Sequence, residues 1–86
     1  MQIRFNQAAR KHRVGRTSAR HVLASVVPTR IVTDQGSPGW LYVGVDEGGR
    51  ELEIVAVEVP DQAGHDAFLL VFHIMPTQLR RRGPHA

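Results

Sequence analysis

The amino-acid sequence predicts an α+β fold in which one or two N-terminal helices pack on a small antiparallel sheet of about four strands, followed by a short basic C-terminal helix or tail. The main observation is a change of period: apolar residues recur at helical spacing before residue 28 and with a period of two after it. The chain has 86 residues, 42% of them apolar, so we expect residues 1–86 to form a single domain with one modest core.

Two helices are predicted before residue 28. Apolar side chains at helical spacing between Phe5 and His12 indicate the first, and residues 3–5 before it are either a short strand or the lead-in to the helix. The second has Thr17 or Ser18 as a candidate N-cap, and Pro28 ends it. Its apolar face is expected to consist of Ala19, Val22, Leu23, Val26 and Val27.

The sheet is predicted from three segments. Residues 29–34 are one strand, and residues 39–59 are a hairpin that turns at Gly48 and Gly49, where a positive φ is available. Alternation in the second arm of this hairpin places Leu52, Ile54 and Ala56 on one face and Glu51, Glu53, Val55 and Val57 on the other.

The last predicted strand covers residues 68–74 and is apolar on both faces, which is typical of a central strand. We expect Leu70 and Phe72 to lie in the core and His73, near the strand end, to face a cleft. Pro76 then turns the chain towards the arginines at positions 80–82.

Composition limits the possible functions. The chain has no cysteine, which excludes disulfides, thiolate metal sites and cysteine nucleophiles and suits a cytoplasmic protein. No apolar run is long enough to span a membrane, and the N-terminal residues lack the pattern of a signal peptide. The five histidines show no metal-ligand spacing, so neither a metal nor another cofactor is expected.

Charge is arranged in blocks along the chain. Residues 1–33 carry seven basic groups and no acid, residues 34–66 carry all eight acids, and residues 67–86 are basic again. Ten of the eleven cations are arginine, whose planar fork suits phosphate or carboxylate. A basic surface of this kind implies an anionic partner, either RNA or an acidic protein segment.

Three stretches resemble the RelE/ParE superfamily of small bacterial toxins, in its BrnT-like branch. "RKH" at residues 10–12 is similar to the "KHG" near the start of BrnT-like members, although the glycine is displaced to Gly15. "WLYVGVDEGGRELEIVAVE" at residues 40–58 is similar to their hairpin, and "FHIMPTQLRRR" at residues 72–82 is similar to their closing strand and basic helix.

This resemblance implies a single toxin domain that acts as a metal-independent messenger-RNA endoribonuclease, free or on the ribosome, and is neutralised by a cognate antitoxin. Some members of the superfamily act on gyrase, and some have lost activity. The alternative is therefore a catalytically inactive binding module on the same fold that docks an acidic protein. A DNA-binding regulator is less well supported, because only one helix is convincing and no helix-turn-helix is visible.

Metal-independent RNA cleavage needs a base, an acid and cations around the phosphate. His73 is the first candidate for proton transfer, because histidine titrates closest to neutrality. Arg80 and Arg81 are candidates for stabilising the phosphate. The resemblance adds Lys11 as a cation and His12 as a second proton carrier.

Each assignment has a structural alternative. His73 and His12 could be packing residues, and the arginine run could be a solvated tail. Glu51 and Glu53 could supply a base or only form a solvent face. Trp40 and Tyr42 could stack on a nucleotide base or belong to the core. RNA or partner binding is predicted for Arg13, Arg16, Arg20, Arg82 and Tyr42.

Overall fold

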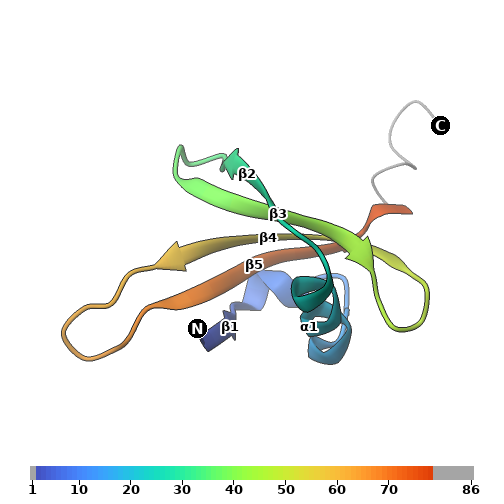
Figure 1. Ribbon diagram of the computed structural model, residues 1–86, viewed down its shortest axis with the longest axis horizontal. Coiled ribbons are helices and arrows are strands. Elements are labelled where there is room, and N and C mark those ends of the chain that lie inside the picture. The colour runs from blue at the N-terminus through green and yellow to red at the C-terminus, as the bar shows by residue number, and fades with distance from the viewer. Residues whose placement is uncertain (1, 79–86) are drawn as a thin grey trace.

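The computed structural model describes residues 2–78, which form a five-stranded sheet with one α-helix packed on one of its faces (Figure 1). The elements are, in chain order, β1 (Gln2–Phe5), a 3-10 turn η1 (Gln7–Arg10), α1 (Arg16–Ser25), β2 (Thr29–Val32), β3 (Pro38–Val45), β4 (Glu51–Val59) and β5 (Phe68–Pro76). Within the described residues, no helix is long and apolar enough to cross a membrane.

The sheet is mixed and has the strand order β1-β5-β4-β3-β2, so the prediction of about four antiparallel strands is wrong. β1 is the additional strand and runs parallel to β5, with Gln2 opposite Phe68 and Phe5 opposite Val71. All other neighbouring strands are antiparallel. A strand of four residues carries too little periodicity to indicate a partner at the far end of the chain, which is why the sequence left residues 3–5 open.

The first predicted helix is also wrong, because residues 7–10 form only one 3-10 turn. The side chain of Asn6 caps this turn by accepting a hydrogen bond of 3.3 Å from the backbone N–H of Ala9. Arg13 then adopts a left-handed φ of 57°, which a continuing helix cannot contain. The predicted C-terminal helix or tail lies outside the described residues.

The second predicted helix is confirmed as α1, with two corrections. Its N-cap is Gly15, which has no side chain for capping, so neither Thr17 nor Ser18 caps it. The hydroxyl of Ser18 instead donates to Glu47 Oε2 in the β3–β4 turn at 3.3 Å. The helix ends at Ser25, and Val27 is 92% exposed rather than part of the apolar face. A residue before proline disfavours the helical conformation, which explains why the helix stops before Pro28.

The core lies between α1 and the sheet face beneath it. The predicted alternation in β4 is confirmed, and the core contains Ala19, Val22, Leu52, Ile54, Ala56, Val71 and Ile74. The helix approaches β3 closely over Gly44. A Cβ atom there would lie 2.6 Å from Cγ1 of Val26 and 3.3 Å from Cγ1 of Val22. Gly44 is therefore needed because it lacks a side chain.

The prediction that β5 lies inside the sheet is confirmed, since β1 and β4 flank it, although β4 is the middle strand of the five. β1 pairs with β5 only as far as Val71, so the second half of β5 has β4 as its one strand neighbour among the described residues. The register shifts between Val55 and Ala56: Ala56 is opposite Val71, but Val55 is opposite His73. Phe72 is the extra residue of this β-bulge.

The bulge changes which side chains of β5 are buried. Phe68, Val71 and Ile74 are buried, at intervals of three instead of two. Leu70 and Phe72 are only half-buried, so their predicted place in the core is wrong. Both line a hollow on the sheet face that α1 does not cover.

The turn between β3 and β4 is organised by Asp46, which is 7% exposed. One carboxylate oxygen, Oδ1, accepts hydrogen bonds of 2.9 Å from the backbone N–H groups of Gly48 and Arg50. The other, Oδ2, lies 3.4 Å from Nε of Arg50. Gly49 has a φ of 88°, which confirms the predicted turn at the two glycines.

We predict that Gly44→Ala lowers the free energy of unfolding by about 1–3 kcal/mol, because the added methyl group forces α1 away from β3. Urea unfolding measures the change. Gly48→Ala is the matched control, since its nearest new contact is 3.5 Å away and its φ is not positive. Equal stability of the two variants would contradict the close approach of α1.

We predict that acid weakens the β3–β4 turn through Asp46. The backbone N–H of Arg50 is the main cause that lowers the pKa of this carboxyl group, and the N–H of Gly48 and the guanidinium group of Arg50 add to it. The stabilisation is therefore present above the pKa of an unfolded Asp, about 3.9, and is lost as the pH falls through the lower folded-state value. Melting temperatures at pH values between about 5 and 2 should fall less steeply in Asp46→Asn.

Candidate functional site

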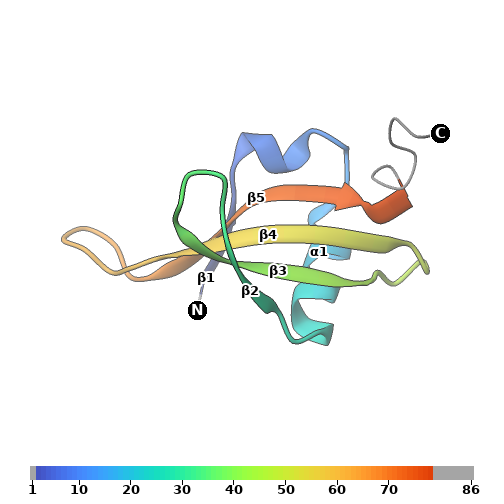
Figure 2. The same cartoon turned by 90° about the horizontal axis from the view of Figure 1, so that it is seen from above.

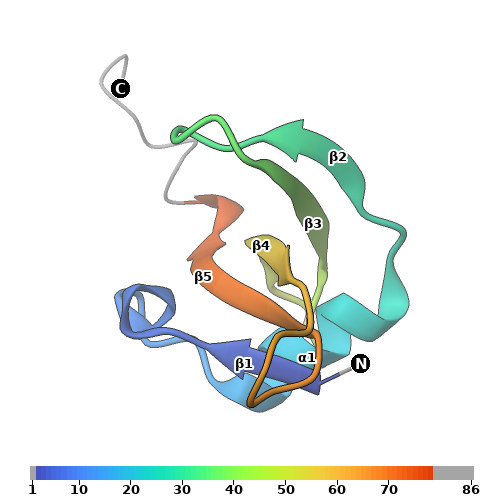
Figure 3. The same cartoon turned by 90° about the vertical axis from the view of Figure 1, so that its left-hand side faces the viewer.

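A cleft lies on the sheet face opposite α1. Figure 3 shows the sheet curling so that β2 and the β2–β3 turn lie over β4 and β5, on the side away from the helix. The cleft consists of two adjoining hollows of about 690 Å³ and 380 Å³ that share Thr33, Asp34 and Phe72. The larger is bounded by the β2–β3 turn and the start of η1, which Figure 2 shows beside β5. We call this region the open-face cleft.

The smaller hollow contains a hydrogen-bonded pair, His73 and Glu53. His73 Nε2 lies 3.0 Å from Glu53 Oε2. The residues come from neighbouring strands: His73 is opposite Val55, and Glu53 is the next residue of β4 on the same face. Diagonal neighbours of this kind are within reach of long side chains. The Glu53 side chain is 10% exposed and that of His73 is 34% exposed, so the histidine lies on the solvent side of the pair.

With Glu53 ionised, this geometry favours one tautomer of the histidine. An ionised carboxylate can only accept hydrogen bonds, so Nε2 carries the proton that is donated to Glu53. In neutral His73, Nδ1 is then the nitrogen that can accept a proton. The carboxylate holds the ring in one orientation, as the third group of a nucleophile–base–carboxylate arrangement does. The pair can therefore act chemically as an oriented base.

Phe72 supplies an aromatic ring between the two hollows, since it lines both of them. A β-bulge can redirect a side chain relative to the regular alternation of a strand, and Phe72 is the residue without a partner opposite it. Its ring is half-buried. An aromatic surface in this position could stack on a planar group such as a nucleotide base.

The lining of the open-face cleft is acidic. Its charged residues are Asp34, Glu53 and Glu58, and no lysine or arginine lines it among residues 2–78. A bound phosphate would need cations from elsewhere in the chain. The predicted cations Arg80, Arg81 and Arg82 lie outside the described residues.

The other predicted site residues do not line this cleft. Lys11 and His12 lie in the turn after η1, where Lys11 is exposed and His12 is half-buried. Arg13 is exposed just beyond them. The guanidinium groups of Arg16 and Arg20 lie 5.9 Å and 5.5 Å from the ring centre of Phe5.

Tyr42 lies on the helix-covered face of the sheet, opposite Ile54 of the core. Its burial raises the pKa of its phenol group. The sheet therefore separates Tyr42 from His73, and the two cannot contact the same small group. Trp40 lies on the same face as Tyr42, because both alternate with Leu41 along β3.

Two residues of the cleft were not singled out as a site from the sequence. The sequence offers Glu53 only as a candidate base, and its pairing with His73 depends on the alignment of β4 with β5. The alternation along β4 does correctly predict that Glu51 and Glu53 lie on the face opposite the core residues Leu52, Ile54 and Ala56. Nothing in the sequence around Phe72 indicates its place in the cleft, because the bulge arises from the pairing of β5 with β4.

Among residues 2–78, no group of three or more histidine, aspartate or glutamate side chains could hold a metal ion. A comparison with protein-family models, with curated proteins and with solved structures finds no match for the chain.

We predict that His73→Ala lowers the free energy of unfolding by about 1–3 kcal/mol, because it removes a hydrogen-bond donor from a largely buried carboxylate. His73→Gln is the matched control, since its amide N–H can still donate to Glu53. Urea unfolding of both variants tests the pair. Equal loss of stability in both would show that the ring packing, rather than the hydrogen bond, is what stabilises this position.

Proposed function

We propose that the protein is an endoribonuclease toxin of the RelE/ParE type that acts in the cytoplasm on messenger RNA, free or on the ribosome, and is neutralised by a cognate antitoxin. The observation that carries this proposal is the His73–Glu53 pair in the open-face cleft, at 3.0 Å. The resemblance of residues 10–12, 40–58 and 72–82 to BrnT-like toxins adds to it.

In this proposal His73 is the base of the reaction. Nδ1 takes the proton of a ribose 2′-hydroxyl, whose oxygen attacks the adjacent phosphorus. The bond from phosphorus to the 5′-oxygen breaks, and that oxygen takes up a proton from an acid. The products are a 2′,3′-cyclic phosphate and a 5′-hydroxyl. Glu53 is a positioning residue, because it acts through the histidine ring.

The remaining parts of the mechanism are assigned to other residues of the chain. Arg80 and Arg81 would stabilise the charge on the phosphoryl oxygens, and Lys11 and His12 would supply a further cation and the acid. Phe72 would stack on a base next to the cleaved bond.

One observation favours a second candidate, a binding module without catalysis. The cleft is lined by three acids and by no cation among the described residues, which disfavours a polyanion there. In that case the basic N-terminal third of the chain would dock an acidic protein, and the His73–Glu53 pair would only stabilise the sheet.

We predict that induced expression of the chain alone stops growth and shortens transcripts, and that His73→Gln abolishes both effects. One acid–base group contributes about 10²–10⁴-fold to the rate. Glu53→Gln should reduce cleavage less than His73→Gln does, because the base remains but its orientation is weakened. Cleavage is measured on a defined RNA with the purified full chain, with end-group analysis of the cyclic phosphate.

Two results would contradict this assignment. Full activity of a folded His73→Gln protein would remove His73 from the mechanism. Normal growth with soluble wild-type protein, and no cleavage in vitro, would favour the binding module.

A further inference from the structure

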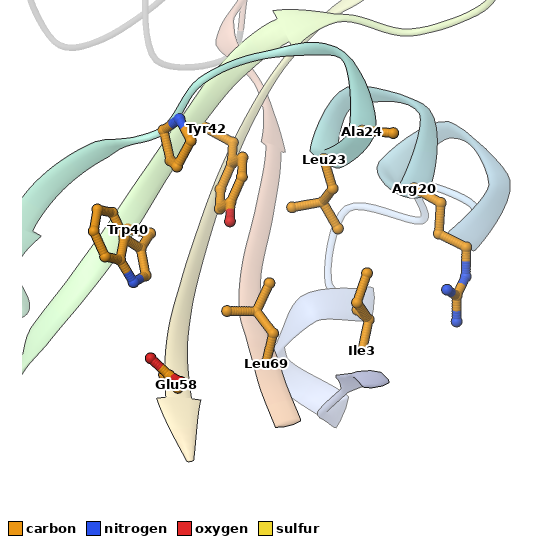
Figure 4. A pocket seen from close by; sticks show the side chains of 9 residues that line it. Ile3, Arg20, Leu23, Ala24, Trp40, Tyr42, Glu58 and Leu69 are labelled. Atoms are coloured by element: carbon orange, nitrogen blue, oxygen red, sulfur yellow. The ribbon is translucent and has the colours of Figure 1, made fainter. Parts of the chain in front are cut away.

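The helix-covered face of the sheet is only partly covered. A helix of ten residues, such as α1, is about 15 Å long, whereas a strand of nine residues, such as β4, is about 30 Å long. Beyond the helix a groove of about 530 Å³ remains between α1 and the sheet (Figure 4). We call it the helix-side groove. Its apolar lining consists of Ile3, Leu23, Ala24, Pro28, Trp40, Tyr42 and Leu69.

This groove and the open-face cleft lie on opposite faces of the sheet, and Glu58, near the end of β4, is the one described residue that lines both. Trp40 and Tyr42 alternate with the residues of β3 that face the other side, and Leu69 is on the same face as core residue Val71. The sheet therefore lies between the groove and His73. Whatever binds in the groove does not need the His73–Glu53 pair.

The hydroxyl of Tyr42 points into the groove (Figure 4). The residue is 9% exposed, and burial alone raises the pKa of its phenol group. Within residues 2–78 no hydrogen bond to this hydroxyl is present. The hydroxyl itself is open to solvent in the groove, since it is not among the buried polar atoms without a partner, so it can donate a hydrogen bond to an acceptor on a bound molecule.

Arginines flank the groove on two sides. Arg20 of α1 lines it directly, and its guanidinium group rests against Phe5 at 5.5 Å from the ring centre. Arg30 of β2 lies over the ring of Trp40 at 5.8 Å from its centre. Aromatic contacts of this kind hold a guanidinium group in place while its N–H groups remain available. Glu58 is the one acid among the described residues that line the groove.

We propose that the helix-side groove docks an acidic amphipathic segment of a partner protein. Its apolar side chains would cover Trp40 and Leu69, and its carboxylates would pair with Arg20 and Arg30. A carboxylate or carbonyl oxygen of the segment would accept the hydrogen bond of Tyr42. This combination of an apolar floor and cationic borders matches a peptide with apolar residues on one side and acids beside them.

Charge complementarity argues against a second copy of the chain as the occupant. A two-fold dimer through this face would bring the same surface of both subunits together. Each subunit would then bring Arg20 and Arg30 to the interface, and Glu58 is the one acid among the described lining residues that could offset them. An acidic partner has no such conflict.

The test uses the full chain and two labelled synthetic peptides. Both have leucines at the i, i+3, i+4 and i+7 positions of a helix, and the remaining positions are glutamate in one peptide and lysine in the other. Anisotropy of the label measures binding at about 0.1 M salt, where long-range attraction is screened. Trp40 is the single tryptophan of the chain and lines the groove, so its fluorescence reports occupancy directly. We expect saturable binding and a change in Trp40 emission with the glutamate peptide only.

Ala24 provides the matched pair of variants, because it lines the groove from an exposed position on α1. Glutamate and lysine are both good helix formers, so Ala24→Glu and Ala24→Lys should fold equally well, which circular dichroism checks. Ala24→Glu should weaken binding of the glutamate peptide by at least about tenfold through like-charge repulsion. Ala24→Lys should bind at least as tightly as the wild type, and Tyr42→Phe should lose a few-fold in affinity.

Three outcomes would overturn the proposal: no saturable binding of the glutamate peptide, equal binding of the two peptides, or equal affinity of the two Ala24 variants. Quenching of Trp40 by a single-stranded oligonucleotide but not by the glutamate peptide would assign the groove to nucleic acid instead. His73→Gln should bind the peptide like the wild type. A failure of the ribonuclease proposal therefore leaves this one standing, and the reverse also holds.

Discussion

The β-bulge at Phe72 is the constraint on which both faces of the sheet depend. Without it, strict alternation along β5 would place His73 on the same face as Val71, in the core, and would turn Ile74 outwards. The extra residue shifts the register by one, so Ile74 completes the core under α1 while His73 faces the open side beside Glu53. A register change of one residue moves every later side chain to the other face. The same irregularity therefore completes the core and exposes the candidate base.

The sheet divides the molecule into two surfaces of different character. The open-face cleft has an acidic lining and an oriented histidine, whereas the helix-side groove has an apolar floor with arginines at its borders. This division follows from the blocks of charge in the sequence. The basic N-terminal third forms β1, α1 and β2, which include Arg20 and Arg30, and the acidic middle third contributes Asp34, Glu53 and Glu58 to the cleft.

The short helix connects stability with the proposed binding surface. α1 packs against Gly44 of β3 at one end of the sheet, where no side chain intervenes. Because it stops at Ser25, the sheet beyond it retains Trp40 and Leu69 as partly buried residues. A longer helix would cover this surface and add to the core. The chain instead keeps an apolar groove whose tyrosine hydroxyl has no acceptor within residues 2–78.

The sequence alone determined the local features: the apolar face of α1, the hairpin turn at Gly48 and Gly49, and the inward side of β4, because each depends on periodicity or turn chemistry among neighbours. The sequence also indicated that His73 faces a cleft. That prediction assumed regular alternation along β5, with Leu70 and Phe72 in the core, and the bulge interrupts this alternation. Tertiary structure decided the rest. The parallel pairing of β1 with β5, the bulge at Phe72 and the contact of His73 with Glu53 each join residues far apart in the chain. Such contacts depend on strand register, and register is set by the packing of the whole sheet rather than by any single segment.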